Sequence, residues 1–194
     1  MSTVKSKKLQ VGTDATASNN FTIYQPSTPD GTLRIGVGNA DNPTEVAKVT
    51  NAGIINTSFP HFFGKLASNQ TLTRATVTKI TGFTSDEIDS ASAFDGTTFT
   101  VPETGKYFFS AQLRVEQLAV NFYYQLRLTT STLAIATIGT NGFDTTTPYF
   151  MLGVSVIVPE NTGGTIKAQL FQSGTATSYV HTESYFCGMK LIGA

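Results

Sequence analysis

The sequence contains no tryptophan, one cysteine and few charged residues. Charged residues make up 13% of the chain, against roughly 25% in an average soluble domain, so Ser, Thr, Asn and Gln must form much of the surface. This composition suits an extracellular or particle-bound β protein. The formal net charge is +0, which excludes the basic patch used to bind nucleic acid. The lone Cys187 excludes an internal disulfide framework, and we interpret it as a small buried residue of the last strand.

Signals for secretion or membrane insertion are also missing from the sequence. The first residues, Met1 to Lys8, are polar and are not followed by the apolar stretch of a signal peptide. No run approaches the roughly 18 apolar residues that a membrane span needs. We therefore expect a protein that is made in the cytoplasm and does not insert into a membrane.

Residues that carry catalysis or bind metals are sparse. His61 and His181 have no His or Cys partner at metal-binding spacing, and no nucleophile motif occurs. The one acidic cluster consists of Asp86, Glu87 and Asp89, which are weak candidates for Ca²⁺ because closely spaced carboxylates can hold this ion. The residue order of a dedicated calcium loop is absent, so a solvated acidic loop is the favoured interpretation. We expect no enzymatic activity and no cofactor.

Alternation of apolar and polar residues dominates the pattern after residue 58, and helical periodicity is almost absent. Between Tyr107 and Val115 the odd-numbered residues are apolar, and between Phe150 and Val158 the even-numbered ones are. The pairs Asp95-Gly96 and Asn141-Gly142 are typical of tight turns. Many short strands separated by such turns predict an all-β sandwich.

A stretch in the middle of this region resembles the signature of the globular head of the first component of complement, a relative of the tumour necrosis factor jelly rolls. The residues that fit are Phe94, Asp95, Gly96, Phe99, Thr100, Pro102, Gly105, Tyr107, Phe109 and Ser110. Residues 184–192 resemble the closing strand of the same family. The resemblance covers residues 59–194 and implies a jelly-roll head of about eight strands in two sheets, packed as a trimer.

A second set of apolar residues supports the expected trimer. They lie on the strand faces opposite to those assigned to the core, where a monomeric sandwich should be polar. We interpret seven of them as trimer-interface candidates: Phe108, Tyr123, Tyr149, Met151, Ile157, Phe171 and Phe186. In the same scheme the apolar face of the last strand carries Tyr185, Cys187, Met189 and Leu191.

Residues 1–58 have a different character. Their expected strands lie at 9–12, 21–24, 33–37, 45–49 and 53–55, with turns that contain Gly, Pro and Asn. Hairpins this short bury too little surface to be stable alone, so they need partners, such as other copies of the chain. This region resembles the strand-and-turn modules of bacteriophage tail fibres and other virion proteins, notably those of cyanophages.

Together these features predict a bacteriophage virion structural protein, in which residues 1–58 form an attachment arm and residues 59–194 a trimeric head. It would decorate or cement the capsid, or form a tail fibre or spike, and so stabilise the virion or contact a host glycan or protein. The candidates for attachment to other virion proteins are Lys5, Lys7, Lys8, Leu9 and Val11.

The alternative is a carbohydrate-binding, lectin-like adhesin. Tyrosine rings stack on sugars and asparagine amides hydrogen-bond to them, so loop residues of these two types are its binding candidates. They are Asn121, Tyr123, Asn141, Tyr149 and Tyr179.

Overall fold

The structure, a computed structural model, describes residues 7–56, 59–116, 122–131, 133–140, 149–174 and 177–191. The chain divides into two compact units, Met1–Phe59 and Pro60–Ala194. Across the described ranges, no helix is long and apolar enough to cross a membrane.

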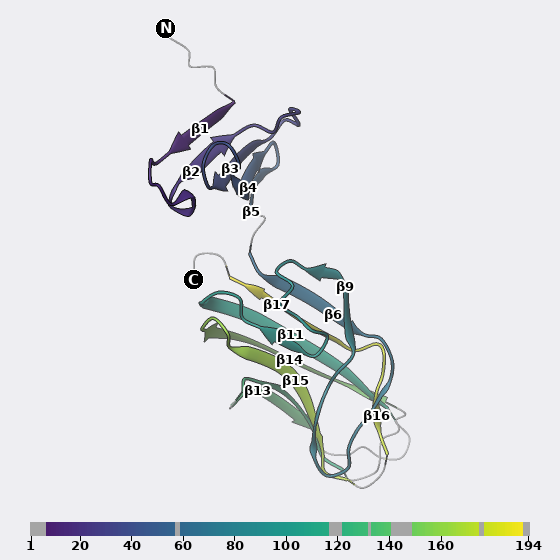
Figure 1. Cartoon of the computed structure of the whole chain (residues 1–194). Helices are drawn as coiled ribbons and strands as arrows, with labels where there is room; N and C mark the ends of the chain where they lie inside the picture. The colour runs from purple at the N-terminus through teal and green to yellow at the C-terminus, as the bar shows by residue number, and fades with distance from the viewer. Residues whose placement is uncertain are drawn as a thin grey trace. The chain divides into compact units, whose positions relative to one another are not determined.

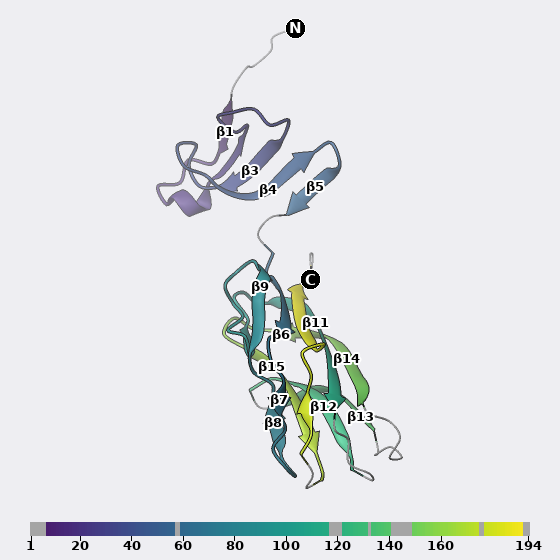
Figure 2. The ribbon, with the colours of Figure 1, turned by 90° about the vertical axis from the view of Figure 1, so that its right-hand side faces the viewer.

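The N-terminal unit is an antiparallel meander of five strands in the order β1-β2-β3-β4-β5, which we call the N-terminal sheet. Figures 1 and 2 show these strands as one layer. Their bounds are β1 (Lys8–Val11), β2 (Phe21–Tyr24), β3 (Leu33–Val37), β4 (Thr44–Thr50) and β5 (Gly53–Asn56), and a 3-10 turn, η1 (Ala17–Asn19), lies between β1 and β2.

The C-terminal unit contains two antiparallel sheets. The large sheet consists of β6 (His61–Leu66), β7 (Gln70–Thr71), β9 (Phe83–Asp89), β11 (Gly105–Glu116), β14 (Tyr149–Glu160), β16 (Tyr179–Val180) and β17 (Tyr185–Lys190). The small sheet consists of β8 (Val77–Lys79), β10 (Thr98–Thr100), β12 (Tyr124–Thr129), β13 (Ala134–Thr140) and β15 (Thr165–Gln172). The expected all-β sandwich is confirmed.

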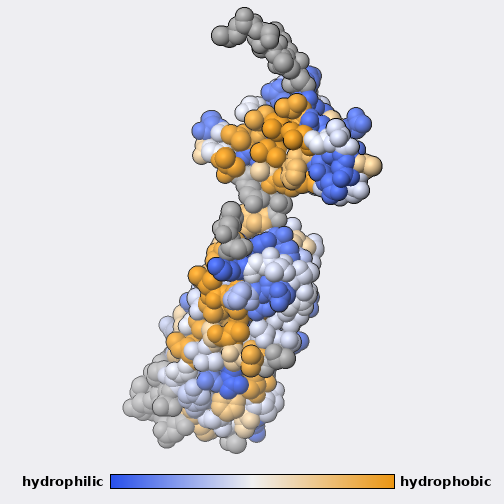
Figure 3. Space-filling model, turned by 90° about the vertical axis from the view of Figure 1, so that its left-hand side faces the viewer, coloured by the Kyte–Doolittle hydropathy of each residue, from blue (hydrophilic) through white to orange (hydrophobic). Residues whose placement is uncertain are grey.

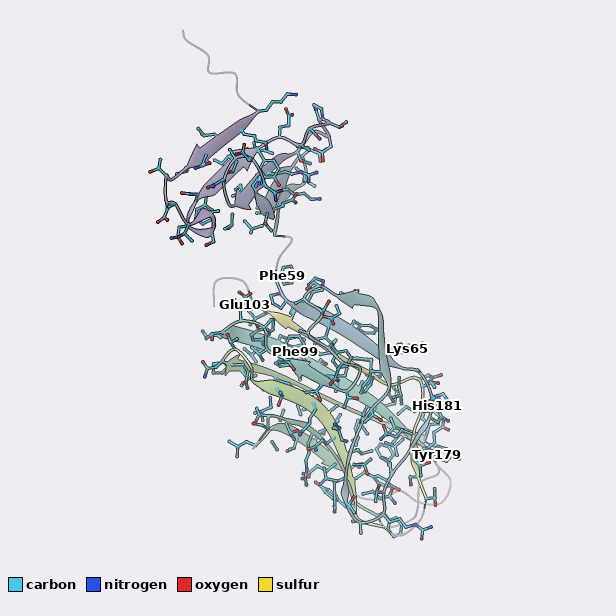
Figure 4. All side chains as sticks on the ribbon, in the orientation of Figure 1. Phe59, Lys65, Phe99, Glu103, Tyr179 and His181 are labelled. Carbon is cyan, nitrogen blue, oxygen red and sulfur yellow. The ribbon has the colours of Figure 1, made fainter. Side chains whose placement is uncertain are left out.

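Aromatic rings from both sheets fill the space between them. Phe62 of β6 stacks on Phe99 of β10 with ring centroids 4.8 Å apart, and it meets Phe186 of β17 edge-on at 4.9 Å. Phe109 of β11 lies 5.6 Å from Phe99, and these four rings are at most 2% exposed. Figure 4 shows Phe99 in the middle of the unit. Ring pairs at these distances add attraction beyond their buried area, so this cluster ties the two sheets together.

The turn before β10 forms as its sequence predicts. The Asp95 carboxylate accepts hydrogen bonds from the backbone N–H groups of Thr97 and Thr98, at 2.9 and 2.7 Å. Gly96 has φ +82°, a conformation that costs glycine little. After the turn, the hydroxyl of Tyr107 donates a hydrogen bond to the carbonyl oxygen of Glu103 at 2.7 Å. The residues of the signature therefore fix the local backbone around β10 and β11.

The acidic cluster is not in a loop, and the expectation of a loop there is wrong. Asp86, Glu87 and Asp89 belong to β9, which lies at an edge of the large sheet and pairs with β6. Charged side chains are common on edge strands because they discourage pairing with another chain. The charged residues are therefore the reason why this strand was not predicted from the sequence.

Candidate assembly interface

The strands β11 and β14 position most of the outer face of the large sheet. They pair antiparallel over twelve residues each, from Gly105 opposite Glu160 to Glu116 opposite Tyr149. The odd residues of β11 from Tyr107 to Val115 point inward and are fully buried. The even residues therefore point outward, because successive side chains of a strand alternate between faces. In Figure 4, Glu103 lies at one end of the unit and Tyr179 at the other.

The outward positions of neighbouring strands include many apolar side chains, which together we call the outer apolar face. Ser110, Gln112 and Ser155 lie among them on β11 and β14. Phe108 of β11 lies directly opposite Ile157 of β14 on one side and Met189 of β17 on the other. The Phe63 and Tyr185 rings stack at 5.7 Å. Ile157 is 61% exposed, although burying a side chain of this size is worth about 1.5–3 kcal/mol. The face consists of Phe63, Phe108, Tyr149, Met151, Ile157, Tyr185, Cys187 and Met189.

A charged cluster lies at the end of this face, centred on Arg114. The guanidinium contacts the carboxylates of Glu116 at 2.6 Å and Glu183 at 2.5 Å, and its carbon lies 4.2 Å above the Tyr149 ring. The hydrogen bond from Arg114 lowers the pKa of the Glu183 carboxyl group. The Nε of Arg114 is buried and makes no hydrogen bond to the residues that the structure describes. The cluster holds its charges in fixed positions, which favours one orientation of a docked partner.

Cys187 lies within the outer apolar face, between Ser110 and Phe63 on the adjacent strands. It is a half-buried free thiol rather than the fully buried core residue that we expected. Burial raises its pKa above the ordinary value of 9.0. The thiol is therefore protonated at neutral pH, which is not the state of a catalytic nucleophile.

The seven trimer-interface candidates divide into three groups. Phe108, Tyr149, Met151 and Ile157 come together on the outer apolar face. Phe171 lies on β15 of the small sheet and Tyr123 just before β12, with ring centroids 6.3 Å apart, so neither belongs to the outer apolar face.

The assignment of Phe186 to the interface is wrong. This ring is fully buried in the core, so Tyr185, Cys187 and Met189 are the outward residues of β17. The last strand has apolar residues on both faces, and alternation alone does not tell which face points inward. One signal was available. Gly188 shares a face with Phe186, and its missing side chain makes room for the Phe109 ring, which a Cβ would approach to 2.4 Å.

The remaining candidates are scattered. Asp89 accepts hydrogen bonds from the backbone N–H groups of Ala93 and Phe94, both at 3.0 Å, and so closes the turn after β9. The side chains of Asp86 and Glu87 lie outside the described part, as do Asn121 and Asn141. Within the part of the chain that the structure describes, no three His, Cys, Asp or Glu residues gather as metal ligands.

Of the attachment candidates, Lys5 lies outside the described residues and Lys7 is exposed. Lys8 donates a hydrogen bond to the carbonyl oxygen of Ala40. Leu9 and Val11 are 58% and 55% exposed on β1. Lys7 immediately precedes β1, and the other three described candidates lie on that strand. The side chains of Lys7, Leu9 and Val11 are exposed.

Two solved structures have related folds. The structure of Eiger TNF from S. frugiperda matches 71% of this chain and 95% of its own, with 11% identity and a TM-score of 0.54. The globular domain of zebrafish complement 1qA protein matches 68% of this chain and 97% of its own, with 14% identity and a TM-score of 0.49. No protein-family model and no curated protein sequence matches the chain. The likeness to the first of these structures shows a jelly-roll fold of the tumour necrosis factor kind.

Proposed function

We propose that the protein is a non-enzymatic homotrimer, assembled through the outer apolar face of its C-terminal unit. The observation that carries this proposal is the exposure of Tyr149, Met151, Ile157 and Met189, between 42% and 61%, on one face of the large sheet. Exposed apolar patches of this kind mark protein interfaces. Jelly rolls of the family that the signature resembles pack as trimers, and closed three-fold symmetry would cover this face in all copies at once.

Light scattering tests this assembly directly. The full chain and a truncated chain of residues 59–194 should each have three times the mass of one copy, which is 20.7 kDa for the full chain. A truncated chain that is monomeric at every concentration would overturn the head interface. A monomeric full chain would remove the homotrimer altogether.

We further propose that this trimer is a structural protein on the surface of a bacteriophage particle. It would be a capsid decoration or a tail fibre, made in the host cytoplasm and fixed to other virion proteins by residues 1–58. The support is the resemblance of residues 1–58 to phage modules and the charge-poor composition of the chain, 13% charged. Antibodies against the C-terminal unit should label purified particles in electron micrographs. Absence of the protein from purified particles would exclude this role.

A second candidate function is carbohydrate binding, and a pocket on the small sheet favours it. The pocket has a volume of about 240 Å³, and its lining combines two cations, an amide and three hydroxyl side chains with no carboxylate. The lining residues are Arg127, Thr129, Thr130, Ser131, Leu133, Ala134, Lys167 and Gln169. The Thr129 hydroxyl is buried, and none of the described residues forms a hydrogen bond with it. The Phe171 ring lies 5.6 Å from the Arg127 guanidinium carbon. Hydroxyls, amides and an adjacent ring are the groups that hold sugars.

A glycan array separates the two functions. If the pocket binds sugars, the protein should select glycans with acidic groups, because the pocket carries two cations and no carboxylate. Replacement of Arg127 by Gln should then abolish binding without changing the oligomeric state. An array without signal would remove the carbohydrate hypothesis. The tyrosines that the sequence offered as sugar-binding candidates do not support the carbohydrate hypothesis, because they do not lie together. Tyr149 and Tyr179 are on the large sheet, whereas Tyr123 is not.

A further inference from the structure

The two faces of the N-terminal sheet are covered unequally. On one face, Thr22 is fully buried and its hydroxyl donates a hydrogen bond to the carbonyl oxygen of Gly38 at 2.9 Å. Gly36 is buried on this face too, and a Cβ there would approach Pro43 to 2.8 Å. Asn20 holds the loops over it through hydrogen bonds to Asp14 and Asn39. The loops of the unit itself therefore cover this face.

The opposite face is apolar, and the described loops of the N-terminal unit do not cover it. Paired residues of antiparallel strands lie on the same face, and the pairing joins Leu9 to Ile23 and Ile23 to Ile35. Five of the side chains on this face, at the sheet's outer strands and strand ends, are 48% to 77% exposed, from Leu33 to Ile54, and the other five are half-buried. Figure 3 shows hydrophobic surface gathered on this unit. We call this the N-terminal apolar face; it consists of Leu9, Val11, Phe21, Ile23, Leu33, Ile35, Val37, Ala47, Val49 and Ile54.

The charged side chains of the strands lie on the covered side, whereas Lys7, just before β1, lines a hollow beside Leu9, Ile23 and Leu33. Arg34 bonds to Asp30 at 2.6 Å and to Glu45 at 2.7 Å, and it lies opposite Lys48 on the polar face. Among the described strand positions, those of the N-terminal apolar face carry no charge. Two copies of such a face meet without repulsion between like charges, whereas a partner that binds by charge finds nothing to recognise.

A small unit with a largely exposed apolar face buries little surface, so covering that face stabilises it. Another copy of the same chain is always available during folding. A hollow of about 460 Å³ lies beside Leu9, Ile23 and Leu33, with Lys7 at its margin.

We propose that the N-terminal apolar face packs against the same face of other copies of this chain. The number of copies, three, rests on the homotrimer proposed above, but the contact itself does not involve the head. In this arrangement Leu9 and Val11 bind neighbouring copies rather than another virion protein. Attachment to a particle then uses the loop-covered, polar side of the unit.

Cysteine cross-linking of the full chain tests the contact. Cys187 is first replaced by Ser, which leaves no other cysteine. Leu33→Cys then places a thiol on the N-terminal apolar face, and the matched control Lys48→Cys places one on the opposite face. A short bismaleimide should link copies through Cys at position 33 and not through Cys at position 48. Equal yields from both variants would contradict the proposal.

The mass of the full chain separates this proposal from the head interface. Ile157→Arg breaks the outer apolar face of the head, and the proposal predicts that this variant stays trimeric until Leu33→Asp is added. If the wild-type chain is a trimer and Ile157→Arg alone yields monomers, the N-terminal contact is overturned and the head interface stands. If Leu33→Asp alone yields monomers, the head interface fails and the N-terminal contact stands.

Discussion

Gly96 stands in a turn where both the backbone angle and a neighbouring strand exclude a side chain. Its φ is +82°, and a Cβ would lie 2.7 Å from the carbonyl oxygen of Phe83. Gly163 has a similar φ, +84°, with open space around it. We expect Gly96→Ala to lower the free energy of unfolding by about 3 kcal/mol and Gly163→Ala by about 1 kcal/mol. Urea unfolding of both variants measures the difference, and equal losses would show that the clash with Phe83 is relieved.

Single residues also show where the alternation of apolar and polar residues fails to predict which strand face points inward. The odd-numbered residues of β11 were expected to face the core, and the structure buries all of them. On β17 the expected inward set, Tyr185, Cys187 and Met189, points outward instead. Both faces of β17 are apolar, so the hydrophobic pattern does not show which face points inward. Packing decides the direction, because only Gly188 leaves room for the Phe109 ring.

At the scale of elements, the loop between β2 and β3 depends on the ionised Asp30. Its carboxylate accepts hydrogen bonds from Thr32 and from Arg34, and the Thr32 hydroxyl is the main reason why the pKa of Asp30 falls to about 2. Because the folded pKa lies below the usual 3.8, this contribution is complete above about pH 4 and is lost as the pH falls toward 2. We expect the carboxyl carbon of Asp30 to titrate near pH 2 in an NMR experiment.

The control for this prediction is Asp30→Asn, which keeps the shape of the loop without the charge. Its N-terminal unit should be less stable than the wild type at pH 6, and the difference should vanish by about pH 2. A wild-type midpoint near 3.8 would mean that the hydrogen bonds do not form.

Elements with strong alternation or clear turns were predictable, and short or charged ones were not. The five strands expected in residues 1–58 form within one or two residues of their expected positions. The two-residue strands β7 and β16 carry too few side chains to show a pattern. The outer apolar face was predictable only in part. It combines residues of β6, β11, β14 and β17, and the pattern of one strand does not reveal with which distant strand it pairs.

For the whole molecule, the head should assemble through the large sheet alone. In a truncated chain of residues 59–194, Ile157→Arg places a charge where Ile157 faces Phe108, and three copies would bring three such charges to one interface. We expect monomers by light scattering, with unchanged far-ultraviolet circular dichroism. The control Leu133→Arg alters an equally exposed side chain, 69% against 61%, outside the large sheet, and should leave the trimer intact. Dissociation by both changes would contradict a specific interface.

Cys187 reports on the same assembly from inside the outer apolar face. Because burial raises its pKa above 9.0, the rate of alkylation should still be rising between pH 8 and 10, since the thiolate is the reactive form. If copies of the head cover this face, the wild-type truncated chain should react far more slowly than its Ile157→Arg variant, in which the thiol is only half-buried. Alkylation in denaturant supplies the unprotected rate. Equal rates in the folded wild type and the variant would mean that the face is open to solvent in the head, and they would refute assembly through the large sheet even if the mass were that of a trimer.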